Sequence, residues 1–190
     1  MRIRPRTRRA VTGAALAGAT VATSLMAVPQ AVAVPAARPT ATAAAIANGT
    51  YLIKTFSGKC FEVLNRSTAN NSRIIQFNCH TTDNYSEKFT VRSAGNGTST
   101  IRVFDDKCLE IQNRSRADNT PIVQYNCRSQ DNYTEKFKIV SAGGGNYRIK
   151  TFNDKCLEVR GGSRANNALI VQYTCRTKDN ARQLFRFQRV

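Results

Sequence analysis

Tryptophan is absent from this chain of 190 residues, histidine occurs once, and acidic residues are scarce, with 12 Asp and Glu against 29 Lys and Arg. A single histidine leaves little room for imidazole catalysis or for a histidine-rich zinc site. The hydrophobic fraction of 41% excludes a polytopic membrane protein. The net charge of +17 is typical of a nucleic-acid-binding protein, so its meaning depends on where the charge lies.

Five of the excess positive charges lie at the N-terminus. Residues 2–9 contain five arginines and no acid, residues 10–28 are uncharged, and Ala31-Val32-Ala33 is a small-x-small triplet. This order predicts a secretory signal peptide over residues 1–33, and Arg8-Arg9 also permits a twin-arginine route. A membrane anchor is disfavoured because the stretch is only weakly apolar. Cleavage would leave a charge of +12, no membrane span, and a secreted, extracellular protein that begins with a flexible leader, residues 34–47.

The rest of the chain repeats with a period of 48 residues. Cysteines mark the period, and the segments around them recur as GKCFEV, DKCLEI and DKCLEV and as RIIQFNC, PIVQYNC and LIVQYTC. The two series are Cys60, Cys108 and Cys156, and Cys79, Cys127 and Cys175. Self-similarity at a fixed period indicates a repeat architecture. The sequence therefore predicts one domain over residues 48–190, with repeats at about 48–94, 95–142 and 143–190.

Each repeat contains four short runs of β-forming residues separated by turn formers. In the third repeat these runs are 147–152, 156–160, 169–175 and 184–190. Twelve strands define an all-β fold. Three units are fewer than the blades of a usual propeller, and an open solenoid of three turns would have two exposed ends. The sequence therefore predicts a β-trefoil of three pseudo-symmetric four-stranded repeats. Its shared core would include Ile75, Val123, Val171, Phe89, Phe137 and Phe185.

Six cysteines in an exported chain indicate disulfides. Of the fifteen connectivities, three respect the repeat, and the simplest of these joins the two cysteines of each unit. The wide cysteine spacing does not suit zinc, and neither a metal site nor a cofactor is expected. The only histidine, His80, is replaced by Arg128 and Arg176 in the other repeats, and it is interpreted as a surface loop residue.

No catalytic constellation can be assembled from the sequence. It lacks Gly-x-Ser-x-Gly, His-Glu-x-x-His and a phosphate-binding glycine loop. Glu62, Glu110 and Glu158 recur once per repeat, so the symmetry keeps them apart, whereas a glycosidase needs two carboxylates across one substrate. The chain is therefore predicted to be non-catalytic.

Recurring polar and aromatic residues suggest one shallow sugar site per repeat. Each unit has an acid, an aromatic residue two positions before its second cysteine, and an Asp-Asn loop. Carboxylates and amides bind hydroxyls, an aromatic ring stacks on the apolar face of a sugar, and three weak sites give avidity on a polymer. The candidates are Glu62, Phe77 and Asn84; Glu110, Tyr125 and Asn132; and Glu158, Tyr173 and Asn180. In the alternative interpretation, the aromatics pack on the disulfides and the Asp-Asn pairs only shape turns.

The order Lys-Cys-Leu-Glu-Val, Ser-x-Ala-Asn-Asn, Ile-Val-Gln-Tyr-x-Cys and Gln-x-Phe resembles the ricin B-type lectin domain over about 145 residues. The resemblance implies a β-trefoil of carbohydrate-binding repeats and up to three sugar sites, often for galactose or xylan-type ligands. It also implies one disulfide within each repeat. These bonds are Cys60–Cys79, Cys108–Cys127 and Cys156–Cys175.

Carried over by position, the resemblance assigns the family's site residues to this chain. Its sugar-binding Asp falls on Glu62, Glu110 and Glu158, and its stacking aromatic on Phe77, Tyr125 and Tyr173. Its Asn-Gln pair falls on Ser86-Glu87, Thr134-Glu135 and Arg182-Gln183, and the Trp of its Gln-x-Trp signature on Phe89, Phe137 and Phe185. The Gln survives only as Gln183, and Asn84, Asn132 and Asn180 are the nearest substitutes for the missing Asn.

The remaining charge of +12 would also suit a basic extracellular protein that binds anionic cell-surface or envelope polymers. The repeated loop arginines Arg66, Arg114, Arg116 and Arg164 support this alternative. Polyanion binding weakens steeply with salt, whereas pocketed sugar binding does not. Export makes nucleic acid an unexpected partner, and a trefoil protease inhibitor has no recognisable loop here. Glycans or polysaccharides are therefore the predicted partners of a monomeric chain.

Overall fold

The computed structural model describes residues 46–82, 85–128 and 133–190. The predicted signal peptide and nearly all of the predicted leader lie outside these residues, so both remain predictions. Within the described ranges, no helix has the length and apolar character needed to cross a membrane.

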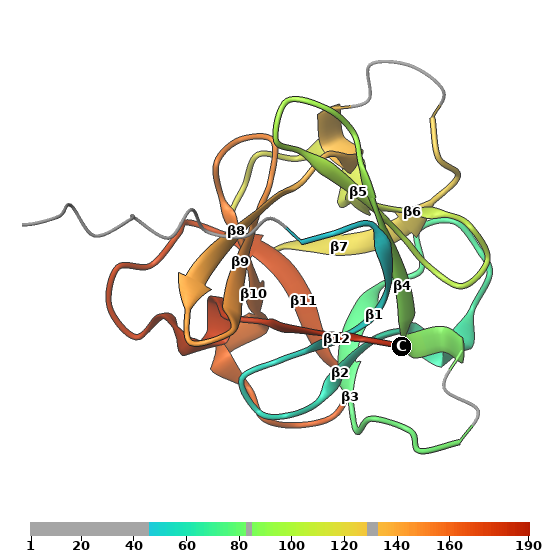
Figure 1. Ribbon diagram of the computed structural model, residues 1–190, viewed down its shortest axis with the longest axis horizontal. Coiled ribbons are helices and arrows are strands. Elements are labelled where there is room, and N and C mark those ends of the chain that lie inside the picture. Colours follow the sequence, from blue (N-terminus) through green and yellow to red (C-terminus); the bar gives the residue numbers. More distant parts are fainter. Residues whose placement is uncertain (1–45, 83–84, 129–132) are drawn as a thin grey trace, which may run out of the picture. The chain divides into compact units, whose positions relative to one another are not determined.

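The described residues form twelve strands, four in each repeat, as the sequence predicts. Figure 1 labels them. The first repeat contains β1 (Gly49–Lys54), β2 (Cys60–Val63), β3 (Ile74–Phe77) and β4 (Lys88–Ser93). The second contains β5 (Ser99–Arg102), β6 (Cys108–Ile111), β7 (Thr120–Tyr125) and β8 (Lys138–Gly143). The third contains β9 (Asn146–Lys150), β10 (Cys156–Val159), β11 (Ala168–Tyr173) and β12 (Arg186–Arg189). The 3-10 turns are η1 (Leu64–Arg66), η2 (Tyr85–Glu87), η3 (Gln112–Arg114), η4 (Tyr133–Glu135), η5 (Arg160–Gly162) and η6 (Asn180–Gln183).

The first and last strands of the three repeats form a closed barrel. Antiparallel ladders join β1 to β4, β4 to β5, β8 to β9 and β12 to β1. Two isolated bridges complete the ring, between Ser99 and Phe137 and between Tyr147 and Phe185. Closure matters because it removes the unpaired strand edges that an open sheet would present.

The middle strands form three hairpins, β2–β3, β6–β7 and β10–β11. Strand β11 pairs with both β3 and β7, and a bridge between Arg73 and Val123 connects the first two hairpins. A six-stranded barrel with three mutually paired hairpins is a β-trefoil, so the predicted fold is confirmed. Figure 1 shows the three repeats arranged around a common centre, from cyan through green and yellow to red.

The core is assembled from equivalent positions of the three repeats. Phe89, Phe137 and Phe185, at the position of the family's tryptophan, are fully buried within it, as predicted. Ile75, Val123 and Val171 are buried too, but Ile75 and Val123 also lie beneath surface pockets. The shared core itself contains the preceding residue of each strand, Ile74, Ile122 and Ile170. Because side chains alternate along a strand, Ile75, Val123 and Val171 face the other side of the hairpins, so their predicted place in the shared core is wrong.

The six cysteines form three disulfides, each within one repeat, as the resemblance implies. The pairs are Cys60–Cys79, Cys108–Cys127 and Cys156–Cys175, each with a sequence separation of 19 residues. Each bond ties the start of a hairpin to the loop that follows it. By the chain-entropy model, closing a loop of this size stabilises the fold by about 3 kcal/mol.

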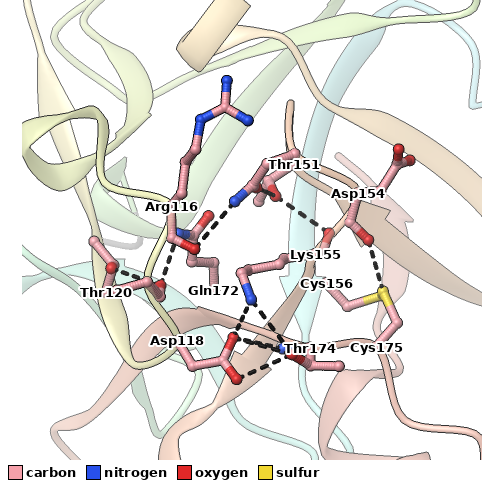
Figure 2. Close-up of polar contacts among 12 residues, drawn as sticks. Arg116, Asp118, Thr120, Thr151, Asp154, Lys155, Cys156, Gln172, Thr174 and Cys175 are labelled. Carbon is pink, nitrogen blue, oxygen red and sulfur yellow. Dashed lines mark hydrogen bonds and ion pairs between the residues drawn. A yellow bond between two sulfur atoms is a disulfide. The ribbon is translucent and has the colours of Figure 1, made fainter.

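Three buried glutamines connect neighbouring repeats. The Nε2 of Gln172 donates to the carbonyl oxygens of Ser115 and Ala117 at 2.8 and 2.9 Å. Figure 2 shows Gln172 beside Arg116 of the same second-repeat loop. Gln76 makes the same pair of bonds to Ser163 and Ala165, and Gln124 to Ser67 and Ala69. These bonds satisfy loop carbonyls that the fold removes from water.

A charged contact strengthens the same junction in Figure 2. Asp118 accepts hydrogen bonds from the Lys155 ammonium, the Thr174 hydroxyl and the Thr174 backbone N–H. Partial burial acts to raise the pKa of Asp118, but the bonds from Lys155 and Thr174 together outweigh it and hold the pKa below its ordinary value. The carboxylate thus fixes the second repeat against the third.

Candidate functional site

Two surface pockets each contain a predicted acid and a predicted aromatic residue. The pocket of the second repeat has a volume of about 380 Å³ and is lined by Asn71, Glu110, Ile111, Asn113, Arg114, Val123, Tyr125 and Arg128. The pocket of the first repeat has a volume of about 280 Å³ and is lined by Glu62, Asn65, Arg66, Ile75, Phe77, His80 and Asn167. The acid and the aromatic residue predicted for each of these repeats therefore lie in one pocket.

Hairpin register explains why the acid and the aromatic residue meet. Glu110 lies opposite Val123 on the β6–β7 ladder, and Cys108 lies opposite Tyr125. Because side chains two residues apart share a face of a strand, all four point to the same side of the hairpin. The first repeat has the same register, with Glu62 opposite Ile75 and Cys60 opposite Phe77.

The acids are buried at the pocket floors and already have partners. Glu110 accepts a hydrogen bond from the Thr134 hydroxyl at 3.1 Å, and its carboxylate lies 3.7 Å from Arg114 and 3.6 Å from Arg128. Its Oε2 atom is the one nearest Arg128, but it accepts no hydrogen bond among the described residues. A buried carboxylate oxygen without a donor is costly, so this atom is suited to a hydroxyl donated by a ligand.

In the third repeat the equivalent acid is more completely paired. Glu158 receives hydrogen bonds from Arg176 Nε at 2.8 Å and Gln183 Nε2 at 2.9 Å, and Arg182 lies 4.0 Å away. The hydrogen bond to Glu158 raises the pKa of Arg176. Since Oε2 of Glu158 accepts two hydrogen bonds whereas Oε2 of Glu110 accepts none among the described residues, Glu158 offers less to a ligand than Glu110 does.

A turn after the acid supplies one of these cations. In η1 and η3, Arg66 and Arg114 adopt the left-handed conformation with φ of 53° and 55°, a strained choice for a residue with a Cβ. The third repeat has Gly162 at this position, and a Cβ there would lie 2.8 Å from Cζ of Arg182. Arg182 thus reaches Glu158 across the space that the absent side chain leaves.

A second acidic position lies behind the first. Glu87 and Glu135 are buried and accept backbone N–H groups, Glu87 from His80 at 3.1 Å and Glu135 from Arg128 at 3.2 Å. Gln183 accepts the same bond from Arg176 at 2.8 Å. Burial raises the pKa of Glu87, although the N–H of His80 acts in the opposite direction.

The predicted aromatic residues each carry a partner over one ring face. Arg128 lies over Tyr125 at 5.0 Å and Arg176 over Tyr173 at 4.6 Å, distances at which cation–π attraction operates. In the first repeat the His80 imidazole stacks on Phe77 instead, with the ring centroids 5.6 Å apart. His80 does lie in a loop, as predicted, but its imidazole lines the pocket.

Sequence reasoning missed two asparagines in each pocket, one from the same repeat (Asn65 or Asn113) and one from a neighbouring repeat. Asn71 of the first repeat lines the pocket of the second, and Asn167 of the third repeat lines that of the first. Both have φ of 64° and donate their N–H groups across the repeat boundary, to the carbonyls of Gln124 and Gln76. The recurrence of this asparagine at the 48-residue period, as Asn71, Asn119 and Asn167, was the available signal.

None of the three asparagines predicted to replace the family's missing Asn is found in the two acidic pockets. Asn84 and Asn132 lie outside the described residues. Asn180 begins η6 and lines a separate cavity of about 430 Å³, together with Arg148, Lys150 and the third disulfide. The amide groups that the structure brings to the acidic pockets are those of Asn71 and Asn113 in the second repeat and those of Asn65 and Asn167 in the first.

Replacing Glu87 with glutamine is expected to raise the free energy of unfolding at neutral pH. The raised pKa means that ionised Glu87 is held less well in the folded chain than in the unfolded one, so its charge opposes folding above that pKa. Gln183 shows that an amide fits this position. Urea unfolding measures the change.

The reverse change in the third repeat is the matched control. Gln183→Glu would bring a second carboxylate to the Glu158 oxygen that now accepts the amide at 2.9 Å, and we expect it to lower stability. A loss of stability in Glu87→Gln would show that the buried charge contributes favourably in the first repeat.

Comparisons with known proteins agree with this architecture. The family model described as the ricin-type beta-trefoil lectin domain matches residues 48–183. No curated protein gives a significant match to the sequence. Among solved structures, the designed 3-fold symmetric protein ThreeFoil is 24% identical, with a TM-score of 0.68 over 75% of this chain and 99% of that chain.

Two natural proteins share the fold. The Macrolepiota procera ricin B-like lectin, solved in complex with lactose, is 20% identical, with a TM-score of 0.61 over 76% of this chain and 99% of its own. The exo-beta-1,3-galactanase from Clostridium thermocellum is 23% identical, with a TM-score of 0.68 over 75% of this chain but only 30% of its own length. The latter likeness concerns one part of a larger enzyme.

The barrel, the three hairpins and their acid-and-aromatic pockets define a β-trefoil domain of the lectin type. Since the family model spans most of the three repeats, the chain belongs to the ricin-type beta-trefoil lectin domain family. This family assignment supports carbohydrate binding.

Proposed function

We propose that the protein is a secreted, non-catalytic, monomeric lectin whose principal sugar site is the pocket of the second repeat. The observation that carries this proposal is the buried Oε2 of Glu110, which has no hydrogen bond among the described residues. A sugar hydroxyl can supply that bond while the ring of Tyr125 contacts an apolar sugar face. Asn71 adds an amide group to the same pocket.

The first and third repeats would contribute unequally to sugar binding. The first-repeat pocket contains an acid, an aromatic residue and Asn167, which supports a second site. In the third repeat, Arg176 and Gln183 occupy the carboxylate of Glu158. We therefore expect binding to depend mainly on the second repeat, and avidity on a polymer to come from the first and second together. The three disulfides are typical of an extracellular protein.

Arginines at the rim of the second-repeat pocket favour one alternative ligand class. The side chains of Arg114 and Arg128 are 46% and 37% exposed beside Glu110. An anionic polysaccharide could pair with them without entering the pocket. Such binding would weaken steeply as salt rises, whereas binding that depends on Tyr125 and Glu110 would change little.

A glycan array at low and high salt tests the proposal. We expect salt-insensitive binding that falls by at least about tenfold in Tyr125→Ala, the loss expected for one ring contact. Tyr133→Ala is the matched control, since this exposed tyrosine belongs to the same repeat and packs on Phe152. Salt-insensitive binding that survives both Tyr125→Ala and Glu110→Ala would refute the assignment of this pocket.

A further inference from the structure

Three side chains with metal-ligating atoms meet at the floor of the first-repeat pocket. One oxygen each from Glu62 and Glu87 and one imidazole nitrogen of His80 all lie within 4.8 Å of one another. His80 Nε2 is 3.5 Å from Glu62 Oε2 and 3.9 Å from Glu87 Oε1. Both carboxylates are buried, while the histidine side chain is 29% exposed toward the pocket.

Comparison of the repeats shows that the first lacks one permanent cation. The second repeat also has two buried acids, Glu110 and Glu135, but it places Arg114 and Arg128 beside them. The third repeat has two arginines and only one acid, because Gln183 replaces the second.

The first repeat keeps both acids, yet among the described residues that line its pocket Arg66 alone carries a permanent positive charge, since His80 stands where the other repeats have arginine. Two buried carboxylates with one guanidinium leave a negative charge that needs a counter-charge. A bound cation would supply it.

The hydrogen bonds around the acids leave the inward atoms directed at the histidine. The Ser86 hydroxyl and the Arg66 guanidinium both contact Oε1 of Glu62, at 3.1 and 3.6 Å, while Oε2 is the atom nearest the imidazole. Glu87 is held by the backbone N–H of His80. Phe77 stacks on the imidazole and fixes its plane. Such outer contacts orient ligands in metal sites.

The spacing suits a small ion. An ion about 2 Å from each of three tetrahedral ligands leaves those ligands about 3.3 Å apart. The two contacts of His80, at 3.5 and 3.9 Å, are close to this separation, so small side-chain rotations would complete the site. Magnesium and calcium prefer oxygen ligands, whereas an imidazole with carboxylates favours zinc and its neighbours in the transition series.

We propose that Glu62, His80 and Glu87 form a site for one divalent transition-metal ion of the zinc type, with its remaining coordination position open to the first-repeat pocket. This site would be a property of the first repeat alone, because the equivalent histidine position is arginine in the other two. The proposal does not depend on sugar binding.

Metal titration of the full chain tests the site directly. The protein is produced in an oxidising compartment without a histidine tag, treated with chelator, and titrated with Zn²⁺ by calorimetry and with Co²⁺ by absorption spectroscopy. The chain suits this experiment because it has one histidine and because all six cysteines are in disulfides. We expect one ion per chain and tetrahedral cobalt bands.

Ligand variants distinguish this site from weak surface binding. Removing a group that hydrogen-bonds to a metal ligand lowers metal affinity by about 10- to 100-fold. His80→Arg and Glu87→Gln remove the ligands themselves, so each should weaken metal binding by at least about 100-fold. Both replacements occur naturally at the equivalent positions of other repeats, as Arg128 and Gln183, so folding should be preserved. Urea unfolding of both variants checks this.

A transplanted site gives the reciprocal test. Arg128→His places an imidazole beside Glu110 and Glu135, and we expect this variant to bind a second ion. Arg176→His in the third repeat has only Glu158 and the amide of Gln183 beside it, so it should bind no additional ion. The proposal is overturned if the parent binds no stoichiometric Zn²⁺, or if Glu87→Gln and His80→Arg bind it as tightly as the parent.

Discussion

Replacing Phe61 with alanine is expected to lower the free energy of unfolding by about 4 kcal/mol. The Phe61 ring is fully buried and packs edge-on against Phe185 and Phe89, with centroid distances of 5.1 and 6.0 Å. The surrounding strands are joined by ladders, so they cannot collapse into the vacated space. Urea unfolding followed by far-UV circular dichroism measures the change, since the chain has no tryptophan to report by fluorescence.

Leucine is the matched control at this position. The other two repeats have Leu109 and Leu157 at the equivalent sites, and both are fully buried. Phe61→Leu therefore keeps an apolar side chain and removes only part of the side-chain volume. We expect a loss of about 1 kcal/mol for this change. If Phe61→Ala cost no more than Phe61→Leu, the ring would not be a close-packed part of the barrel.

The fold could be predicted because its information is local and repeated. Cysteine spacing defined the unit, and short β-forming runs between turn formers gave four strands in each repeat. Strand ends were less accurate. Residues 184–190 were predicted as one strand, but β12 spans Arg186–Arg189 because the N–H of Leu184 bonds back to Ala181 in the η6 turn.

The pockets could be predicted only in part, because each is completed by a neighbouring repeat. The acid and the aromatic residue share one hairpin, so a within-repeat pattern finds both. Asn71 and Asn167 come from the preceding repeat in the ring, and their placement follows from how β3, β7 and β11 pair. That pairing is a consequence of closure, which no single repeat encodes.

Differences between the repeats were harder to interpret than their similarities. Periodicity draws attention to what recurs, so His80, which does not recur, was assigned to the surface. The structure places it beside the recurring acid, in the role of Arg128 and Arg176. Likewise, Gly162 is a turn former by sequence, whereas in space its missing Cβ admits Arg182. Substitutions that break the symmetry therefore determine what each pocket can bind.

Replacing Gln172 with alanine is expected to lower the free energy of unfolding by about 3 kcal/mol. Its side chain is fully buried and donates to two carbonyls of the neighbouring repeat, at Ser115 and Ala117. Alanine would remove that donor from both carbonyls, of which Ala117 keeps only the Thr120 hydroxyl among the described residues, and would open a cavity beneath the loop. Urea unfolding measures the loss.

The equivalent glutamine of the first repeat gives a graded comparison. Gln76 makes the same two bonds, and in addition its Oε1 accepts the Ser57 hydroxyl at 3.2 Å, whereas Oε1 of Gln172 has no hydrogen bond among the described residues. The unpaired buried oxygen of Gln172 offsets part of the stabilisation that its two donated hydrogen bonds provide. Gln76→Ala should therefore lower the free energy of unfolding more than Gln172→Ala does. A smaller loss in Gln76→Ala, or no loss in either, would show that the hairpins are held together by their strand ladders and not by these amides.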